Sequence, residues 1–308
     1  MHLLIPFASA LSEASTHTLR DLALPNLARL LTTLSPVETV GGDEYSLTPP
    51  HERAIAQAFG WEGADGTLPW AAHLAAADGI EVGHRPWGVL TPVHWHVGRE
   101  HVTLTDPDEL HLGDAQSRRL LDTVRPLFES EGWTLAYGAP TRWYAAHDSL
   151  DALPCASLDR VVGRNVDLWL EVHPQARLIR RLQSEVQMQL YHDTLNDERE
   201  ARGELPVNSF WLSGCGRAQA TRRIADLQID PCLRAPMLAG DWAAWADAWR
   251  ALDAGPLADL LRREPGMVAL TLCGERRAQR FERVPRSALQ RLAGVFRPAA
   301  PHTILEAL

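Results

Sequence analysis

A short apolar run followed by a helical pattern constrains the fold of this chain more than any other feature. Residues 3–8 are almost continuously apolar, which is typical of a strand buried on both faces. Residues 12–34 then carry leucines at helical spacing, and Pro25 interrupts them at a position that suits the first turn of a second helix. A buried strand followed directly by helices is how an α/β domain begins, so the sequence predicts an α/β fold.

The middle of the chain predicts a different order of elements. Its patterns indicate extended segments, a helix capped by Asp114, two strands around Gly138, an amphipathic helix and a last strand, at residues 87–106, 114–131, 133–147, 175–195 and 207–212. Strand, helix, two strands, helix, strand is the ferredoxin-like order. We therefore expect an inserted α+β cap subdomain at residues 80–205 and an α/β core formed by residues 1–79 and 206–308.

The last third of the chain returns to alternating helices and strands. Asp241 is expected to cap a helix in which Trp242, Trp245 and Trp249 form one stripe, and such a stripe is usually part of a core. Residues 267–273 are expected to form a buried strand, and residues 279–284 are expected to pair with it. Earlier in the chain, Pro49-Pro50 predicts a helix over residues 51–59.

Composition excludes several classes of protein. The 308 residues carry a net charge of -9 and show no dominant basic face, which argues against nucleic acid as a partner. No apolar run reaches the roughly 18 residues that a membrane helix needs, and no basic region precedes the first apolar run, as a signal peptide would require. The four cysteines form no C-x-x-C pair, so we expect them to be reduced and mostly buried in a cytoplasmic protein.

A group of histidines is the first candidate for chemistry. His94 and His96 would point to one face of a strand, and a hairpin through Gly98 would bring His101 or Asp106 near them. Imidazoles and a carboxylate are ligands for zinc or iron. The alternative is a polar sheet face on which the histidines only form hydrogen bonds.

The stretch of residues 192–216 is the second candidate. Asn196 and Arg199 would lie near a helix end and a turn, whereas Asn208 lies in an otherwise apolar strand, where a buried amide needs partners. Trp211 adds an aromatic wall just before a glycine turn. These groups suit a small anionic ligand, and they suit a well-made structural turn equally well.

Two common catalytic patterns are incomplete. Gly214-Cys215-Gly216 follows a predicted strand, where backbone N–H groups can hold a phosphate, but Gln219 stands where a dinucleotide fingerprint has its third glycine. Ser213 is not part of a G-x-S-x-G motif. The sequence therefore favours a glycine turn or a simple anion site over a nucleotide site.

Several segments resemble known proteins. The pattern H-x3-N-x2-R-x3-G-x2-P-x-N-x2-W-x2-G-x-G, over residues 192–216, and LPNLARL, over residues 24–30, resemble archaeal-type cofactor-independent phosphoglycerate mutases. LLIPFASAL, TPPHERAIA, SLDRVVGRNVDLWL, RRLQSEVQMQLYHDTLND and PVNSFWLSGCG together resemble bacterial RpfE-type regulatory proteins, which are often labelled phosphoglycerate mutase. The mutases belong to the alkaline-phosphatase superfamily, so the resemblance implies an α/β core with an inserted cap.

The mutase resemblance also implies that this chain lacks metal-binding residues of the family. The family uses two divalent metals and a serine nucleophile, and an Asp-Gly pair after its first strand supplies a metal ligand. This chain has Pro6-Phe7 in that region, and Ala28 replaces the aspartate of the family's next helix. Without two metals, phosphoryl transfer loses its main charge stabilisation. The resemblance therefore implies a protein that has the fold of the mutases but lacks their two-metal centre.

Three hypotheses follow for the function. The first is a regulatory or ligand-sensing protein with no cofactor, which binds a small anion in a cleft between core and cap; the expected contact residues are Asn196, Arg199, Asn208, Trp211, Gly214, Gly216, Arg142 and Arg164. The second is a phosphotransferase or hydrolase with a divalent metal held by His94, His96, His101 and Asp106. The third is a protein that binds a regulatory partner through an exposed aromatic surface that includes Trp143 and Tyr144.

Overall fold

The computed structural model describes residues 1–170, 173–222, 226–263, 268–283 and 300–308. The chain divides into two compact units, and each is described by itself. Unit 1 combines Met1–Phe59 with Arg222–Leu308, and unit 2 is Gly60–Thr221. The boundaries that the sequence predicted, near residues 80 and 205, both lie inside unit 2.

Unit 1 is built on a mixed five-stranded sheet. Its strand order is β2 (Ser35–Gly41), β11 (Arg277–Glu282), β10 (Ala269–Cys273), β1 (His2–Ile5) and β9 (Leu227–Ile229). β1 runs parallel to both β10 and β9, whereas β11 runs antiparallel to β10 and β2. The predicted first strand and the predicted pair near the C-terminal end are therefore confirmed, although Met267 and Val284, at the edges of that pair, lie outside the described residues.

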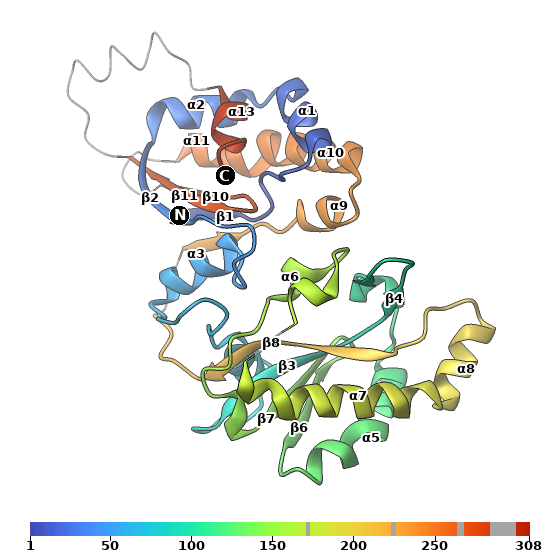
Figure 1. Ribbon diagram of the computed structural model, residues 1–308. Helices are drawn as coiled ribbons and strands as arrows, with labels where there is room; N and C mark the ends of the chain where they lie inside the picture. Colours follow the sequence, from blue (N-terminus) through green and yellow to red (C-terminus); the bar gives the residue numbers. More distant parts are fainter. Residues whose placement is uncertain (171–172, 223–225, 264–267, 284–299) are drawn as a thin grey trace. The chain divides into compact units, whose positions relative to one another are not determined.

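Helices cover both faces of this sheet (Figure 1). On one face lie α1 (Glu13–Asp21), α2 (Pro25–Thr33), α10 (Trp242–Leu252), α11 (Ala258–Arg262) and α13 (Pro301–Leu305), which share one apolar core with β1 and β10. The short α9 (Arg234–Leu238) precedes α10, and a π-helical turn, η5 (Asp253–Leu257), joins α10 to α11. On the other face lies α3 (Pro50–Phe59), which packs against β2, β10 and β11.

Local chemistry explains the helices of unit 1. Pro25 occupies the first turn of α2, where its missing N–H costs no hydrogen bond. Leu24 gives no side-chain cap, so the buried carboxylate of Asp253 accepts hydrogen bonds from the first N–H groups of α2 instead. Trp245 and Trp249 are fully buried, which confirms the predicted core stripe of α10.

Unit 2 has the strand–helix–strand–strand–helix–strand order that the sequence predicted. Its sheet order is β6 (Thr134–Ala139), β7 (Arg142–Ala146), β3 (Pro86–Val93) and β8 (Ser209–Arg217), with every neighbouring pair antiparallel. Helices α5 (Asp114–Glu129) and α7 (Arg177–Tyr191) cover one face through a large apolar core (Figure 1). Helix α4 (Trp70–Ala77) packs on the other face.

The remaining elements of unit 2 are short. They are the hairpin of β4 (Trp95–Val97) and β5 (Val102–Leu104), the helices α6 (Leu158–Val161) and α8 (Thr194–Ala201), and the 3-10 turns η1 (Pro107–Leu110), η2 (Asp148–Leu150), η3 (Val166–Leu168) and η4 (Pro174–Ala176). The parts of the chain described here contain no helix of sufficient length and apolar character to cross a membrane.

The structure corrects three local predictions. Asp114 is the first residue of α5, and the capping position belongs to Gly113. The helix predicted over residues 175–195 ends at Tyr191, because Asp193 accepts a hydrogen bond from the N–H of Leu195 and begins a second helix. The predicted strand over residues 207–212 begins at Ser209 and continues to Arg217.

A fourth correction concerns the aromatic surface. Trp143 is 1% exposed and Tyr144 is 0% exposed, so neither side chain offers an interface to a partner. Trp143 is part of the apolar core, and its indole N–H donates to Ser117 at 2.8 Å. Alternation along β7 places the two rings on opposite faces of the sheet, and both faces are covered.

Candidate functional site

Arg199, which was expected to contact a ligand, is bound by the protein itself. Its guanidinium is fully buried and donates to the backbone oxygens of Leu205 at 2.8 Å and Leu110 at 2.5 Å. It also donates to the side-chain oxygen of Gln116 at 2.8 Å and lies 3.3 Å from a carboxylate oxygen of Glu204. These contacts fasten α8 to η1 and α5, and they favour a structural role.

The two asparagines of the same stretch also bond to the backbone. Asn196 donates to the carbonyl groups of Leu190 and Val207 and accepts from the N–H of Val207, at 2.8–2.9 Å. Asn208 accepts from the N–H of Trp95 at 2.7 Å and donates to its carbonyl at 3.0 Å. Both amides therefore replace missing backbone partners, one at the end of α7 and one beside β4. A ligand role for them stays a prediction.

Trp211 lies beside a small apolar cavity of about 40 Å³. Its indole N–H donates to the carbonyl of Ala156 at 2.9 Å, so the ring is fixed at the wall. Cys155 and Trp169 also line the cavity, and Arg180, at the edge, is exposed. The aromatic wall that the sequence suggested is present, but the surroundings are mainly apolar.

Gly214 and Gly216 are part of a strand. Both lie within β8, opposite a register shift in β3, which is a β-bulge. Gly214 has φ +64°, and a Cβ there would come within 2.9 Å of the Cβ of Trp70; a Cβ on Gly216 would come within 3.1 Å of Pro69. The two glycines let the start of α4 approach the sheet closely, which accounts for them without a bound phosphate.

The two further arginines differ in their surroundings. Arg142 donates to both carboxylate oxygens of Asp78, at 2.9 and 3.0 Å, and to the hydroxyl of Tyr144 at 2.8 Å. Burial raises the pKa of Asp78, but hydrogen bonds from Tyr144 and Arg142 outweigh that effect and lower it below its usual value. Arg164 lies over the ring of Trp169, with its guanidinium carbon 6.0 Å from the ring centroid. Arg142 is therefore an ion-pair partner within unit 2.

The four predicted metal ligands do not converge. The rings of His94 and His96 are 6.4 Å apart between centroids, and Nδ1 of His94 lies 2.9 Å from the backbone oxygen of Pro206. Asp106 caps η1 by accepting from a backbone N–H, and His101 lies exposed in the turn before β5. Among the described residues, these four do not bring three ligand atoms within 4.8 Å of one another.

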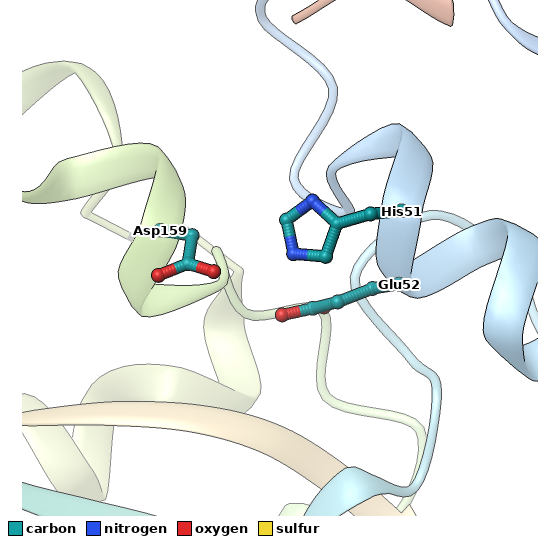
Figure 2. Close-up of side chains that lie close together, drawn as sticks. All are labelled: His51, Glu52 and Asp159. Atoms are coloured by element: carbon teal, nitrogen blue, oxygen red, sulfur yellow. The ribbon is translucent and has the colours of Figure 1, made fainter. Parts of the chain in front are cut away.

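A second set of metal-ligand types begins α3. His51 is buried against Phe7, with ring centroids 4.9 Å apart, and Glu52 follows it in the first turn. One ligand atom of His51 and one of Glu52 lie within 4.8 Å of each other. Figure 2 draws this pair with Asp159, which lies in the first turn of α6 in unit 2. The positions of the units relative to each other are not determined, so the structure defines the pair on α3 alone as a candidate.

The end of β1 is filled by apolar side chains. Phe7 is 7% exposed and has φ +58°, a conformation that is uncommon for a residue with a side chain. The carbonyl of Phe7 accepts from the indole N–H of Trp245 at 3.1 Å, and the N–H of Ala8 donates to the carbonyl of Cys273 at 2.7 Å. Phe7 is therefore packed into unit 1 at the end of β1.

Unit 1 also contains a cavity of about 270 Å³ that is lined by three arginines. Arg29 is on α2, Arg263 follows α11 and Arg283 follows β11. We call this cavity the arginine pocket; its apolar lining is formed by Leu30, Leu34, Leu260, Leu261 and Val268.

The three arginines of the pocket are available to a ligand. Their side chains are exposed, and within the described parts of the chain none of them forms an ion pair. The described lining residues include no acid. Three guanidinium groups around one cavity can each donate two parallel hydrogen bonds to a phosphate or a carboxylate. No local sequence pattern signals this group, because its members come from three distant segments.

Comparisons with known proteins show remote similarity only. No family model and no curated protein matches the chain. Its structure is similar to that of the cofactor-independent phosphoglycerate mutase of Thermoplasma acidophilum, with 12% identity, a TM-score of 0.40 and coverage of 100% of both chains. It is also similar to the PH0037 protein of Pyrococcus horikoshii, with 10% identity, a TM-score of 0.45, and coverage of 91% of this chain and 86% of that one.

These comparisons support the coarser part of the expected resemblance. They give no support to the resemblance to RpfE-type proteins, and they leave a remote likeness to a phosphoglycerate mutase. Both TM-scores are below 0.5, so neither likeness carries an argument about function. The case for a function therefore depends on the side chains of this protein.

Proposed function

We propose that this protein binds a small, multiply charged anion in the arginine pocket of unit 1. One observation carries the proposal: Arg29, Arg263 and Arg283 line a single cavity whose described residues include no acid. The whole chain has a net charge of -9, so it repels anions on average, and a local cluster of cations is needed to hold one. The three guanidinium groups also repel one another, and a bound anion relieves that repulsion.

The dimensions and the lining of the pocket restrict the ligand. A volume of about 270 Å³ lies just below the range of about 300–1,000 Å³ for small-molecule sites, so the ligand is small. The guanidinium groups suit phosphate or carboxylate groups, and the leucine side chains suit a short carbon skeleton. A phosphorylated carbon compound with a second anionic group combines these properties.

Ligand sensing fits this pocket better than catalysis does. The only hydroxyl groups in its described lining belong to Thr32 and Thr33, and both donate to backbone carbonyl groups of their own helix, at 2.7 and 2.9 Å. No histidine, cysteine or carboxylate is available among the described lining residues to act as a base or a nucleophile. Together with the apolar end of β1, this supports a regulatory or ligand-sensing protein without the two-metal centre of the mutases.

Calorimetric titration tests the proposal directly. The purified full chain is titrated with inorganic pyrophosphate and with phosphoglycerate at fixed ionic strength, because salt screens such contacts. The test variant combines Arg29→Gln, Arg263→Gln and Arg283→Gln. Hydrogen bonds to charged groups contribute about 1.5–3 kcal/mol each, so the affinity of the triple variant should fall by about 100-fold or more.

A control variant separates the pocket from general charge. It combines Arg118→Gln, Arg202→Gln and Arg250→Gln, which remove the same charge from exposed side chains that already pair with nearby carboxylates. The control should keep the wild-type affinity. If neither probe binds the wild-type protein, or if both variants lose affinity equally, the arginine pocket is not an anion site.

The pair on α3 favours a second candidate, a metal-dependent phosphotransferase or hydrolase. His51 and Glu52 supply an imidazole and a carboxylate, which are ligands for zinc or manganese. Elemental analysis of the unchelated protein tests this function, with His51→Ala as the variant and His94→Ala as the control. Metal lost from His51→Ala and retained in His94→Ala, with phosphoester hydrolysis lost in parallel, would favour the enzyme. A metal-free and folded wild-type protein would dismiss it.

A further inference from the structure

Two buried cysteines of unit 2 lie in contact. The sulfur atoms of Cys155 and Cys215 are 3.5 Å apart, although the two residues are separated by 60 positions in the chain. Neither forms a disulfide; Cys215 is 0% exposed and Cys155 is 6% exposed. A disulfide has a sulfur–sulfur distance of about 2.05 Å, so a movement of about 1.5 Å would close the bond.

The surrounding backbone fixes the position of each thiol. The N–H of Cys155 donates to the carbonyl of Gly66 at 2.9 Å, which holds the loop after η2. Cys215 lies at the bulge of β8, opposite Gly88 of β3. A Cβ at Gly88 would lie 3.2 Å from the sulfur of Cys215, so the glycine leaves the space that this thiol occupies. The two sulfur atoms lie together because the bulge in β8 directs the side chain of Cys215 and Gly88 leaves room for it.

One of the two thiols faces a cavity. Cys155 lines the cavity of about 40 Å³ beside Trp169 and Trp211, whereas Cys215 is not among its lining residues. A cavity needs a volume of about 10–15 Å³ to hold one water molecule, so this cavity can hold a molecule of the size of hydrogen peroxide. Cys155 is therefore the thiol that a small oxidant meets first.

We propose that Cys155 and Cys215 are a peroxide-sensitive pair that closes to a reversible disulfide. In the first step the sulfur of Cys155 attacks hydrogen peroxide, the O–O bond breaks, and Cys155 becomes a sulfenic acid while one water leaves with the thiol proton. In the second step the sulfur of Cys215 attacks that sulfur, the S–O bond breaks, and a second water leaves. Two thiols are oxidised by two electrons and one peroxide is reduced to two waters. A thiol reductant restores both cysteines by exchange.

The disulfide would change unit 2 in a measurable way. It would join β8 covalently to the loop before α6 and close a long loop of chain, which restricts the unfolded state and stabilises the folded one. It would also move the wall of the cavity beside Trp211. Oxidation is therefore expected to raise the Tm of unit 2 and to change its tryptophan fluorescence. This inference is independent of the arginine pocket in unit 1.

Mass spectrometry of the full chain tests the pair. The variant Cys232→Ser removes the exposed cysteine, so that only buried thiols remain. The folded protein is treated with hydrogen peroxide, then denatured and alkylated. We expect a loss of two hydrogen atoms per chain, a linked peptide that contains Cys155 and Cys215, and full alkylation of both after treatment with dithiothreitol.

Single substitutions separate the two roles. Cys215→Ser should stop at the sulfenic acid of Cys155, which dimedone traps, and Cys155→Ser should leave Cys215 reduced. Three results would overturn the proposal: complete alkylation of both cysteines after peroxide treatment of the folded protein, a disulfide that joins two chains, or oxidation of Cys155 to the sulfinic acid without a linked peptide. A parallel sample of glutathione, treated with the same peroxide, reports that the peroxide was active.

Discussion

Replacement of Arg199 by alanine should destabilise unit 2 strongly and leave anion binding by unit 1 unchanged. The substitution removes the donors for two backbone carbonyl groups, of Leu205 and Leu110, and for the side chain of Gln116. A buried acceptor left without a partner costs about 1–3 kcal/mol, so the two carbonyl groups alone cost roughly 2–6 kcal/mol. The ion pair with Glu204 adds little, because the Glu204 side chain is 35% exposed. We expect a loss of about 3–5 kcal/mol in the free energy of unfolding.

Urea unfolding followed by tryptophan fluorescence and circular dichroism measures this loss, with separate transitions allowed for the two units. Arg202→Ala is the matched control, because Arg202 is exposed, lies at the end of the same helix and pairs with the same glutamate. It should cost less than about 1 kcal/mol. A loss below about 1 kcal/mol for Arg199→Ala, with weaker anion binding, would refute the structural role and restore Arg199 as a ligand-binding residue.

Three further predictions test the local explanations. Gly214→Ala should lower the stability more than Gly240→Ala does, as measured by thermal melts. Both glycines have a left-handed backbone, which costs an alanine roughly 1–2 kcal/mol, but only the new Cβ at position 214 meets neighbouring atoms, at 2.9–3.0 Å. Asp253→Ala should cost about 2 kcal/mol in urea unfolding, because it removes the acceptor for the first N–H groups of α2. Burial lowers the pKa of His2 from 6.5 to about 4, so folding favours its neutral form. The stability that neutral His2 contributes is fully present above pH 6.5 and is lost as the pH falls to about 4. Over that range, the Tm of His2→Gln should therefore fall less than the Tm of the wild-type protein.

Periodicity predicted the elements that depend on one apolar face. The leucines after residue 12 and the tryptophans of α10 repeat at helical spacing, so their burial followed from the sequence. The order of strands and helices in unit 2 followed in the same way. Periodicity failed where a polar residue or a glycine changes its role through a distant contact. Asp193 ends one helix and begins another, and Gly214 continues a strand through a bulge, because its missing side chain admits α4.

The candidate site could not be predicted from local pattern. The sequence marked Asn196 and Arg199 as polar residues among apolar ones, and both do form buried hydrogen bonds. The sequence does not show whether the partner of such a side chain is a ligand or a backbone carbonyl. Arg29, Arg263 and Arg283 are ordinary surface arginines in the sequence, and only the folding of unit 1 places them around one cavity. The pair of Cys155 and Cys215 is equally invisible in the sequence, because no short motif links them.

The two ends of the sheet in unit 1 differ in the side chains that lie there. Ligands of α/β sheets usually bind beyond the carboxyl ends of parallel strands. Here the parallel strands β1 and β10 lead at that end to Phe7, which is 7% exposed, and to Gly274, where a Cβ would lie 2.7 Å from the Cβ of Leu308. Side chains of the chain itself, those of Phe7, Ser9 and Leu308, therefore lie at this end. The arginine pocket lies at the opposite end, where Val268 precedes β10 and Arg283 follows β11. If the pocket fails to bind an anion, the sensing function loses its support in unit 1.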